Sequence, residues 1–145
     1  MRTLAILVHA DPIVRTAYQA ALPADCDLVI LNAPGGGRSS AYTRLARDIA
    51  NRGRGTMLEE IVRFAGGLEL SRYRAVAIAT FSAGYGLARE VLADDGSARQ
   101  LAGLVAIDSW HAGFDRDHTA ADAQLQDLIA YAERARRGEV VCWLG

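Results

Sequence analysis

The sequence predicts an α/β fold, a three-layer α/β/α domain built on a five-stranded, mostly parallel sheet. Five short apolar runs are separated by helical patterns, as the strands and crossovers of a parallel sheet require. The runs do not alternate between apolar and polar residues, which is typical of strands buried on both faces. The chain has 145 residues, of which 51% are hydrophobic and 23% are charged, and it is long enough to bury one core.

We expect a strand at each apolar run and a helix in each interval between runs. Right-handed crossovers should then place helices on both faces of the sheet. The apolar runs are residues 4–8, 28–31, 75–79, 104–107 and 140–144.

Capping residues set the expected helix boundaries. Asp11 before Pro12 is a typical N-cap followed by proline at the first helical position. Gly53 and Gly55 should divide a long helical region into two helices, and Gly138 should end the last helix. The helical intervals are about 12–22, 40–70, 83–92 and 118–137.

Composition excludes several classes of protein. The net charge of −1 gives no basic excess for nucleic acid or an anionic membrane. Cys26 and Cys142 lack metal-site spacing and are expected to be reduced thiols. The first apolar run is too short for a signal peptide, and no run could span a membrane. We therefore expect a cytoplasmic protein that has no metal or organic cofactor.

Polar side chains follow the ends of the predicted strands. His9 follows the first strand, Asn32 and the glycines of the 35–37 loop follow the second, and Ser82 follows the third. Asp108 and His111 follow the fourth strand. Ligands of open α/β sheets bind at the carboxyl ends of the strands, so the sequence predicts a site at this edge.

Ser82 has the strongest local pattern. It stands between a buried strand and a helix, with Gly84 and Gly86 two and four positions later. Small residues allow the helix and strand of such a turn to approach closely, and the serine hydroxyl then projects above the sheet. This pattern predicts a nucleophile elbow; the alternative is that Ser82 only caps the following helix.

The segment Thr80-Phe-Ser82-Ala-Gly84 resembles the G-x-S-x-G elbow of the α/β-hydrolase superfamily, with Thr80 in place of the first glycine. The segment 8–10 is similar to that family's His-Gly oxyanion segment, with Ala10 in place of glycine. The resemblance implies a strand order of 2-1-3-4-5 and a single hydrolase-like domain over residues 1–145. It also implies an oxyanion hole made by the backbone N–H groups of Ala83 and Ala10.

The resemblance makes Asp108 the candidate triad acid, but the family's histidine usually follows one further strand. A serine nucleophile needs an adjacent base, and three alternatives remain open. His111 serves as the base, three residues after Asp108. Another polypeptide or a missing C-terminal segment supplies the histidine, in which case the domain is incomplete. The third alternative is that the chain has no catalysis.

The resulting expectation is a serine hydrolase acting on an ester or a related small acyl compound. Ser82 would attack the carbonyl carbon, His111 would transfer the proton, and Asp108 would orient the imidazole. The residues expected to bind the substrate are His9, Asn32, Gly36, Arg38 and Tyr85.

Two non-catalytic interpretations remain open. The strand at 140–144 could pair with a second copy or a partner chain. The loop Gly35–Gly37 with Arg38 could bind an anion such as phosphate. A degenerate receiver domain is a further alternative, although His9 and Ala10 replace its acidic residues and the chain contains no lysine.

Overall fold

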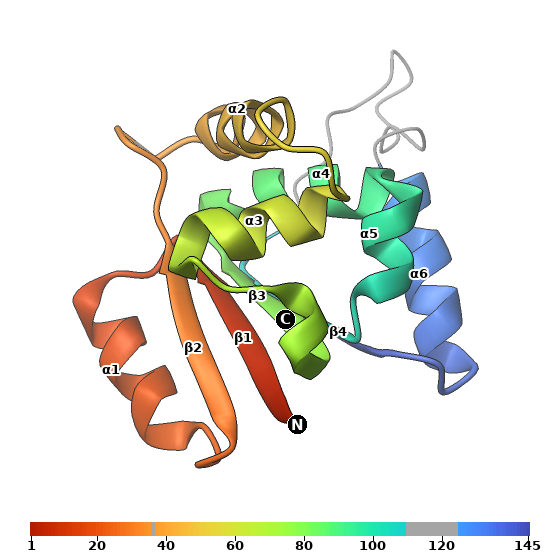
Figure 1. Ribbon diagram of the computed structural model, residues 1–145, viewed down its shortest axis with the longest axis horizontal. Helices are drawn as coiled ribbons and strands as arrows, with labels where there is room; N and C mark the ends of the chain where they lie inside the picture. Colours follow the sequence, from red (N-terminus) through yellow and green to blue (C-terminus); the bar gives the residue numbers. More distant parts are fainter. Residues whose placement is uncertain (36, 110–124) are drawn as a thin grey trace.

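The computed structural model describes residues 1–35, 37–109 and 125–145. Its centre is a five-stranded sheet in the order β2-β1-β3-β4-β5 (Figure 1), and all four strand pairs are parallel. The strands are β1 (Arg2–Val8), β2 (Cys26–Leu31), β3 (Tyr73–Phe81), β4 (Gly103–Ile107) and β5 (Val141–Leu144). The predicted fold class and strand order are confirmed.

The helices occupy the intervals between the strands. They are α1 (Pro12–Ala21), α2 (Ser39–Ala50), α3 (Met57–Gly66), α4 (Tyr85–Ala93), α5 (Asp95–Gln100) and α6 (Gln126–Arg136), with the 3₁₀ turns η1 (Leu70–Arg72) and η2 (Ser82–Gly84). The short helix α5 was not predicted. Within the predicted helix 118–137, the described part becomes helical at Gln126, and residues 118–124 lie outside the described ranges.

Local capping explains where the helices begin and end. The Asp11 carboxylate accepts a hydrogen bond from the Val14 N–H group at the start of α1. Thr56 and Glu59 form a reciprocal capping box at the start of α3. Gly67 ends α3 with a left-handed φ of 62°, a conformation that favours glycine. The predicted break between two helices in the 40–70 region is confirmed.

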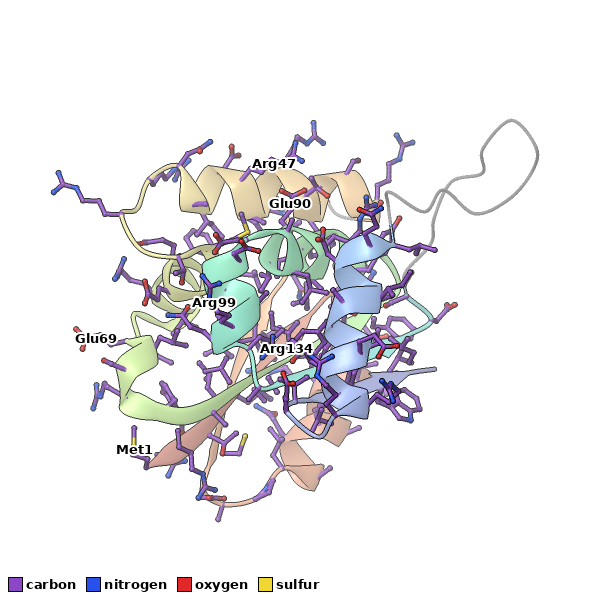
Figure 2. The ribbon with its side chains drawn as sticks, turned by 90° about the vertical axis from the view of Figure 1, so that its right-hand side faces the viewer. Met1, Arg47, Glu69, Glu90, Arg99 and Arg134 are labelled. Carbon is purple, nitrogen blue, oxygen red and sulfur yellow. The ribbon has the colours of Figure 1, made fainter. Side chains whose placement is uncertain are left out.

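Helices cover both faces of the sheet. Helix α1 lies on one side, and α2, α3 and α4 lie on the other (Figures 1 and 2). This division follows from the strand order, because the crossover from β1 to β2 runs in the opposite direction to the later ones. Leu4, Ile6 and Val8 of β1 are fully buried within the main core, toward α2–α4. The core therefore holds β1 and β3 rigidly, and the ends of these strands carry the candidate site.

Candidate active site at the carboxyl edge of the sheet

Three residues at this edge have an unusual backbone conformation. His9, Ser82 and Asp108 have φ values of 62°, 46° and 44°, and they are the non-glycine residues with positive φ in the described ranges. Each directly follows a strand, and the three strands β1, β3 and β4 are neighbours. Such residues are strained by roughly 1–3 kcal/mol each and cluster at functional sites. The strain therefore marks the edge where the sequence predicted a site.

Close backbone contacts explain the two glycines after Ser82. A Cβ atom at Gly84 would lie 2.7 Å from the Val8 carbonyl oxygen and 3.2 Å from the His9 Cβ atom. A Cβ atom at Gly86 would overlap the Ser39 carbonyl oxygen. Both positions require glycine because the obstructing atoms include backbone. The same contacts place the turn of Ser82 beside the end of β1 and the start of α2.

The hydroxyl of Ser82 is free of hydrogen bonds to the described residues. The residue is half-buried, and its side chain makes no hydrogen bond to any residue that the structure describes. The turn η2 begins at Ser82, and no side chain caps it or the following helix α4. The N–H groups of a first helical turn lack intrahelical acceptors. Ala83, a predicted oxyanion donor, lies in this turn immediately after Ser82.

The Ser109 side chain, after β4, is bonded to the turn that contains Ser82. Its hydroxyl oxygen lies 2.8 Å from the Ile107 carbonyl oxygen and 3.3 Å from the Ser82 carbonyl oxygen. It also lies 3.3 Å from the hydroxyl of Thr80, which is buried. Thr80, which replaces the family's first glycine, thus contributes to a link between β3 and β4. Sequence analysis did not select Ser109, although its place next to Asp108 at a strand end was a usable signal.

The segment after β1 is held by Asn32. The Ala10 N–H group donates to the Asn32 side-chain oxygen at 2.9 Å, and the Asn32 side-chain nitrogen donates to the Ala10 carbonyl oxygen at 3.1 Å. The Ala10 N–H group was predicted to bind an oxyanion, but in this structure it is already used. Asn32, predicted to bind substrate, here fixes the backbone of a neighbouring strand end.

His9 is held in a defined orientation by Tyr42. The Nδ1 atom of His9 lies 2.7 Å from the Tyr42 hydroxyl, and the two rings meet edge to face. Burial raises the pKa of Tyr42, and a backbone hydrogen bond from Ala33 opposes this effect. The direction of this hydrogen bond depends on the His9 tautomer, because the Tyr42 hydroxyl can donate to Nδ1 or accept from it. When the Tyr42 hydroxyl donates, a neutral His9 ring carries its proton on Nε2.

A small pocket adjoins these groups. Its volume is about 290 Å³, and its lining includes Tyr42, which is buried. The other lining residues are His9, Ala10, Asp11, Asn32, Ala33 and Phe81. His9 and Asn32 were both predicted to contact the substrate, and the structure brings them together here. Phe81, the residue before Ser82, connects this pocket to the elbow.

Asp108 lies on the strand next to Ser82. Phe81 and Ile107, the residues before them, are paired in the register of β3 and β4. Asp108 is exposed, and its carboxylate forms no ion pair with the residues of the described ranges. The structure thus brings Ser82 and Asp108 to adjacent strand ends. His111, the predicted base, lies outside the described residues.

The remaining predicted substrate contacts are divided among three places. Tyr85 is buried at the start of α4, and Arg38 is exposed immediately before α2. Gly36 lies outside the described residues. Within the described ranges, no cluster of three or more His, Cys, Asp or Glu side chains could hold a metal ion.

Comparisons with known proteins identify no relative of this chain. No family model matches the chain, and no curated protein or solved structure is significantly similar to it. In the part of the chain that the structure describes, no helix has the length and apolar character needed to cross a membrane.

Proposed function

We propose that the chain is a serine hydrolase that cleaves an ester or related acyl substrate with Ser82 as the nucleophile. The observation that carries the proposal is the left-handed Ser82, followed by glycines that backbone contacts require. A helix-capping serine needs neither feature, because an N-cap residue has an ordinary extended φ. The strain, together with a hydroxyl that caps no helix and bonds to no described residue, favours a nucleophile over a cap.

The mechanism assigns one role to each group at the edge. The Ser82 oxygen attacks the carbonyl carbon while a histidine accepts the hydroxyl proton. The Ala83 N–H group, in an uncapped first helical turn, donates to the developing oxyanion. The histidine returns its proton to the leaving group, and water then hydrolyses the acyl-enzyme by the same sequence of steps. Asp108 orients the histidine.

We assign the base to His111 rather than His9. In the proposed arrangement the Tyr42 hydroxyl donates a hydrogen bond to Nδ1 of His9, so the neutral ring presents an N–H donor from Nε2. A donor suits binding a substrate oxygen, whereas a base needs a free ring lone pair. His9 therefore acts as a substrate-binding residue beside the elbow.

Labelling with a fluorophosphonate probe tests the proposal. The wild-type chain should be labelled, and Ser82→Ala should abolish labelling, whereas Ser71→Ala, at the opposite end of β3, should leave it unchanged. His111→Ala should slow labelling by about 10²-fold or more, as expected for loss of a general base, and His9→Ala should have a smaller effect. A folded wild-type chain that the probe never labels would exclude catalysis by this chain alone.

The exposed strand β5 favours a second candidate, a non-catalytic assembly module. Val141, Trp143 and Leu144 are 65%, 52% and 52% exposed on a strand at the end of the sheet. Such an edge can pair with a strand of another chain. Size-exclusion chromatography with light scattering tests this candidate. A strictly monomeric chain whose Ser82 is labelled would reject it in favour of the hydrolase.

A further inference from the structure

A basic groove lies between α2 and α4. Its volume is about 600 Å³, and four arginines line it: Arg38, Arg44 and Arg47 from α2 and its N-cap, and Arg89 from α4. No acidic side chain is among its lining residues within the described ranges. The hydroxyl groups of Ser39, Ser40 and Thr43 complete the lining. The groove thus offers hydrogen-bond donors and positive charge together.

Three of these arginines have no ion-pair partner among the described residues. Arg47 binds both carboxylate oxygens of Glu90, at 2.8 and 2.9 Å, across the two helices (Figure 2). Arg38, Arg44 and Arg89 form no ion pair with any described residue. The groove thus holds three guanidinium groups that no described acidic side chain neutralises, in a chain whose net charge is −1. Like charges placed together repel one another, so the cluster favours an anionic ligand.

The groove lies beside the first turn of α4, which follows the proposed nucleophile in the chain. Ser39 of the groove is in contact with Gly86, four residues after Ser82. The Thr43 hydroxyl, also in the groove, lies 3.3 Å from the Gly86 carbonyl oxygen. Arg89 follows Ser82 by seven residues, or roughly 10 Å at the rise of a helix. One small molecule could therefore reach both Ser82 and the arginines.

We infer that this groove binds a phosphate group of the substrate, so that the hydrolase acts on acyl esters that carry a phosphate. The planar guanidinium fork matches phosphate oxygens, and three positive charges suit a phosphate dianion better than a single carboxylate. The inference rests on the proposed function for the reaction, but the binding of phosphate by the groove does not depend on Ser82.

Calorimetric titration with inorganic phosphate tests the groove by itself. The wild type and Ser82→Ala should bind phosphate equally, and Arg38→Gln/Arg44→Gln/Arg89→Gln should lose binding. The control is Arg15→Gln/Arg54→Gln/Arg72→Gln, which changes the net charge equally. Its three arginines lie outside the groove and form no ion pair with a described residue. Equal weakening in both triple variants would overturn the inference. So would binding only to phosphatidic acid vesicles, which indicates a membrane headgroup instead.

Hydrolysis of a matched ester pair tests the substrate class. With 4-acetoxyphenyl phosphate, the groove variant should raise KM at least tenfold, whereas kcat/KM for neutral phenyl acetate should stay within twofold. The control variant should change neither. A groove variant that keeps the wild-type preference for the phosphate ester overturns the inference. If phosphate binds through the groove but the probe never labels Ser82, the proposed function fails and the binding site stands.

Discussion

The two edges of the sheet differ in how their polar groups are satisfied. At the amino edge, Arg2 donates to Asp27 at 2.9 Å, the Tyr73 hydroxyl donates to the same carboxylate at 3.1 Å, and Arg74 pairs with Asp25. These residues have ordinary backbone conformations. The carboxyl edge carries three strained residues, and the side chains of two of them, Ser82 and Asp108, have no partner within the described ranges.

This difference indicates where the fold is optimised for stability and where it is not. Paired charges and a relaxed backbone stabilise the amino edge. At the carboxyl edge, the strain and the polar side chains without a described partner give the fold no stability. Functional sites commonly retain such strain because the surrounding core enforces it. The comparison supports a site at the carboxyl edge independently of any sequence motif.

The largest expected difference between the edges concerns their glycines. Gly84→Ala should lower the free energy of unfolding by about 1–3 kcal/mol, because its Cβ atom would meet the Val8 carbonyl oxygen at 2.7 Å. Gly103→Ala, at the start of β4, should cost less than about 1 kcal/mol, because its nearest neighbour is the Ala77 methyl group at 3.2 Å.

Urea denaturation of both variants measures this difference, and labelling of Ser82 should fall only in Gly84→Ala. Equal losses of stability in the two variants would show that the contact between Gly84 and the Val8 carbonyl oxygen does not limit the side chain at position 84. The comparison of the two edges would then lose its main support.

A second prediction concerns the two ends of β3. Ser82→Gly should raise the free energy of unfolding by about 1 kcal/mol, because glycine adopts a left-handed φ without strain. Ser71→Gly, before β3, should lower it by about 0.5–1 kcal/mol, because its backbone is unstrained and glycine loses more entropy on folding. Thermal unfolding should therefore shift in opposite directions. A loss of stability in both variants would refute strain at Ser82.

The sequence was sufficient for the features that depend on local pattern. Apolar runs identified the five strands, and the glycine spacing after Ser82 identified the turn. In the structure those glycines are required because the backbone of Val8 and Ser39 lies against them. Capping residues such as Asp11 set the helix starts. Each of these features is encoded by residues a few positions apart, which is why the pattern predicts them.

The features that sequence analysis missed depend on contacts between distant segments. The hydrogen bond between His9 and Tyr42 joins residues 33 positions apart. Asn32 engages the Ala10 N–H group from 22 positions away, and the arginine groove exists only because α2 and α4 are packed together. No local periodicity encodes these pairings, so the roles of Tyr42 and the arginines required the tertiary structure.

The smallest expected effect is the pH dependence of the amino edge. The hydrogen bond from Arg2 holds the pKa of Asp27 below its usual value; desolvation opposes this effect, and the Tyr73 hydroxyl adds to it. A carboxyl whose pKa is lower in the folded state stabilises the fold above its unfolded pKa, near 4. That stability is lost as pH falls through the lowered folded pKa.

Asp27→Asn should therefore unfold at a lower temperature than the wild type at pH 6, and the gap should narrow as the pH falls from 5 to 2.5. Arg2→Gln should reduce the same pH dependence, and the double variant should lose less stability than the two single variants added together, because both remove the Arg2–Asp27 ion pair. Thermal unfolding followed by circular dichroism measures the gap at each pH. A gap that stays constant down to pH 2.5 would mean that the Asp27 ion pair does not stabilise the amino edge, which would leave strain alone to distinguish the two edges.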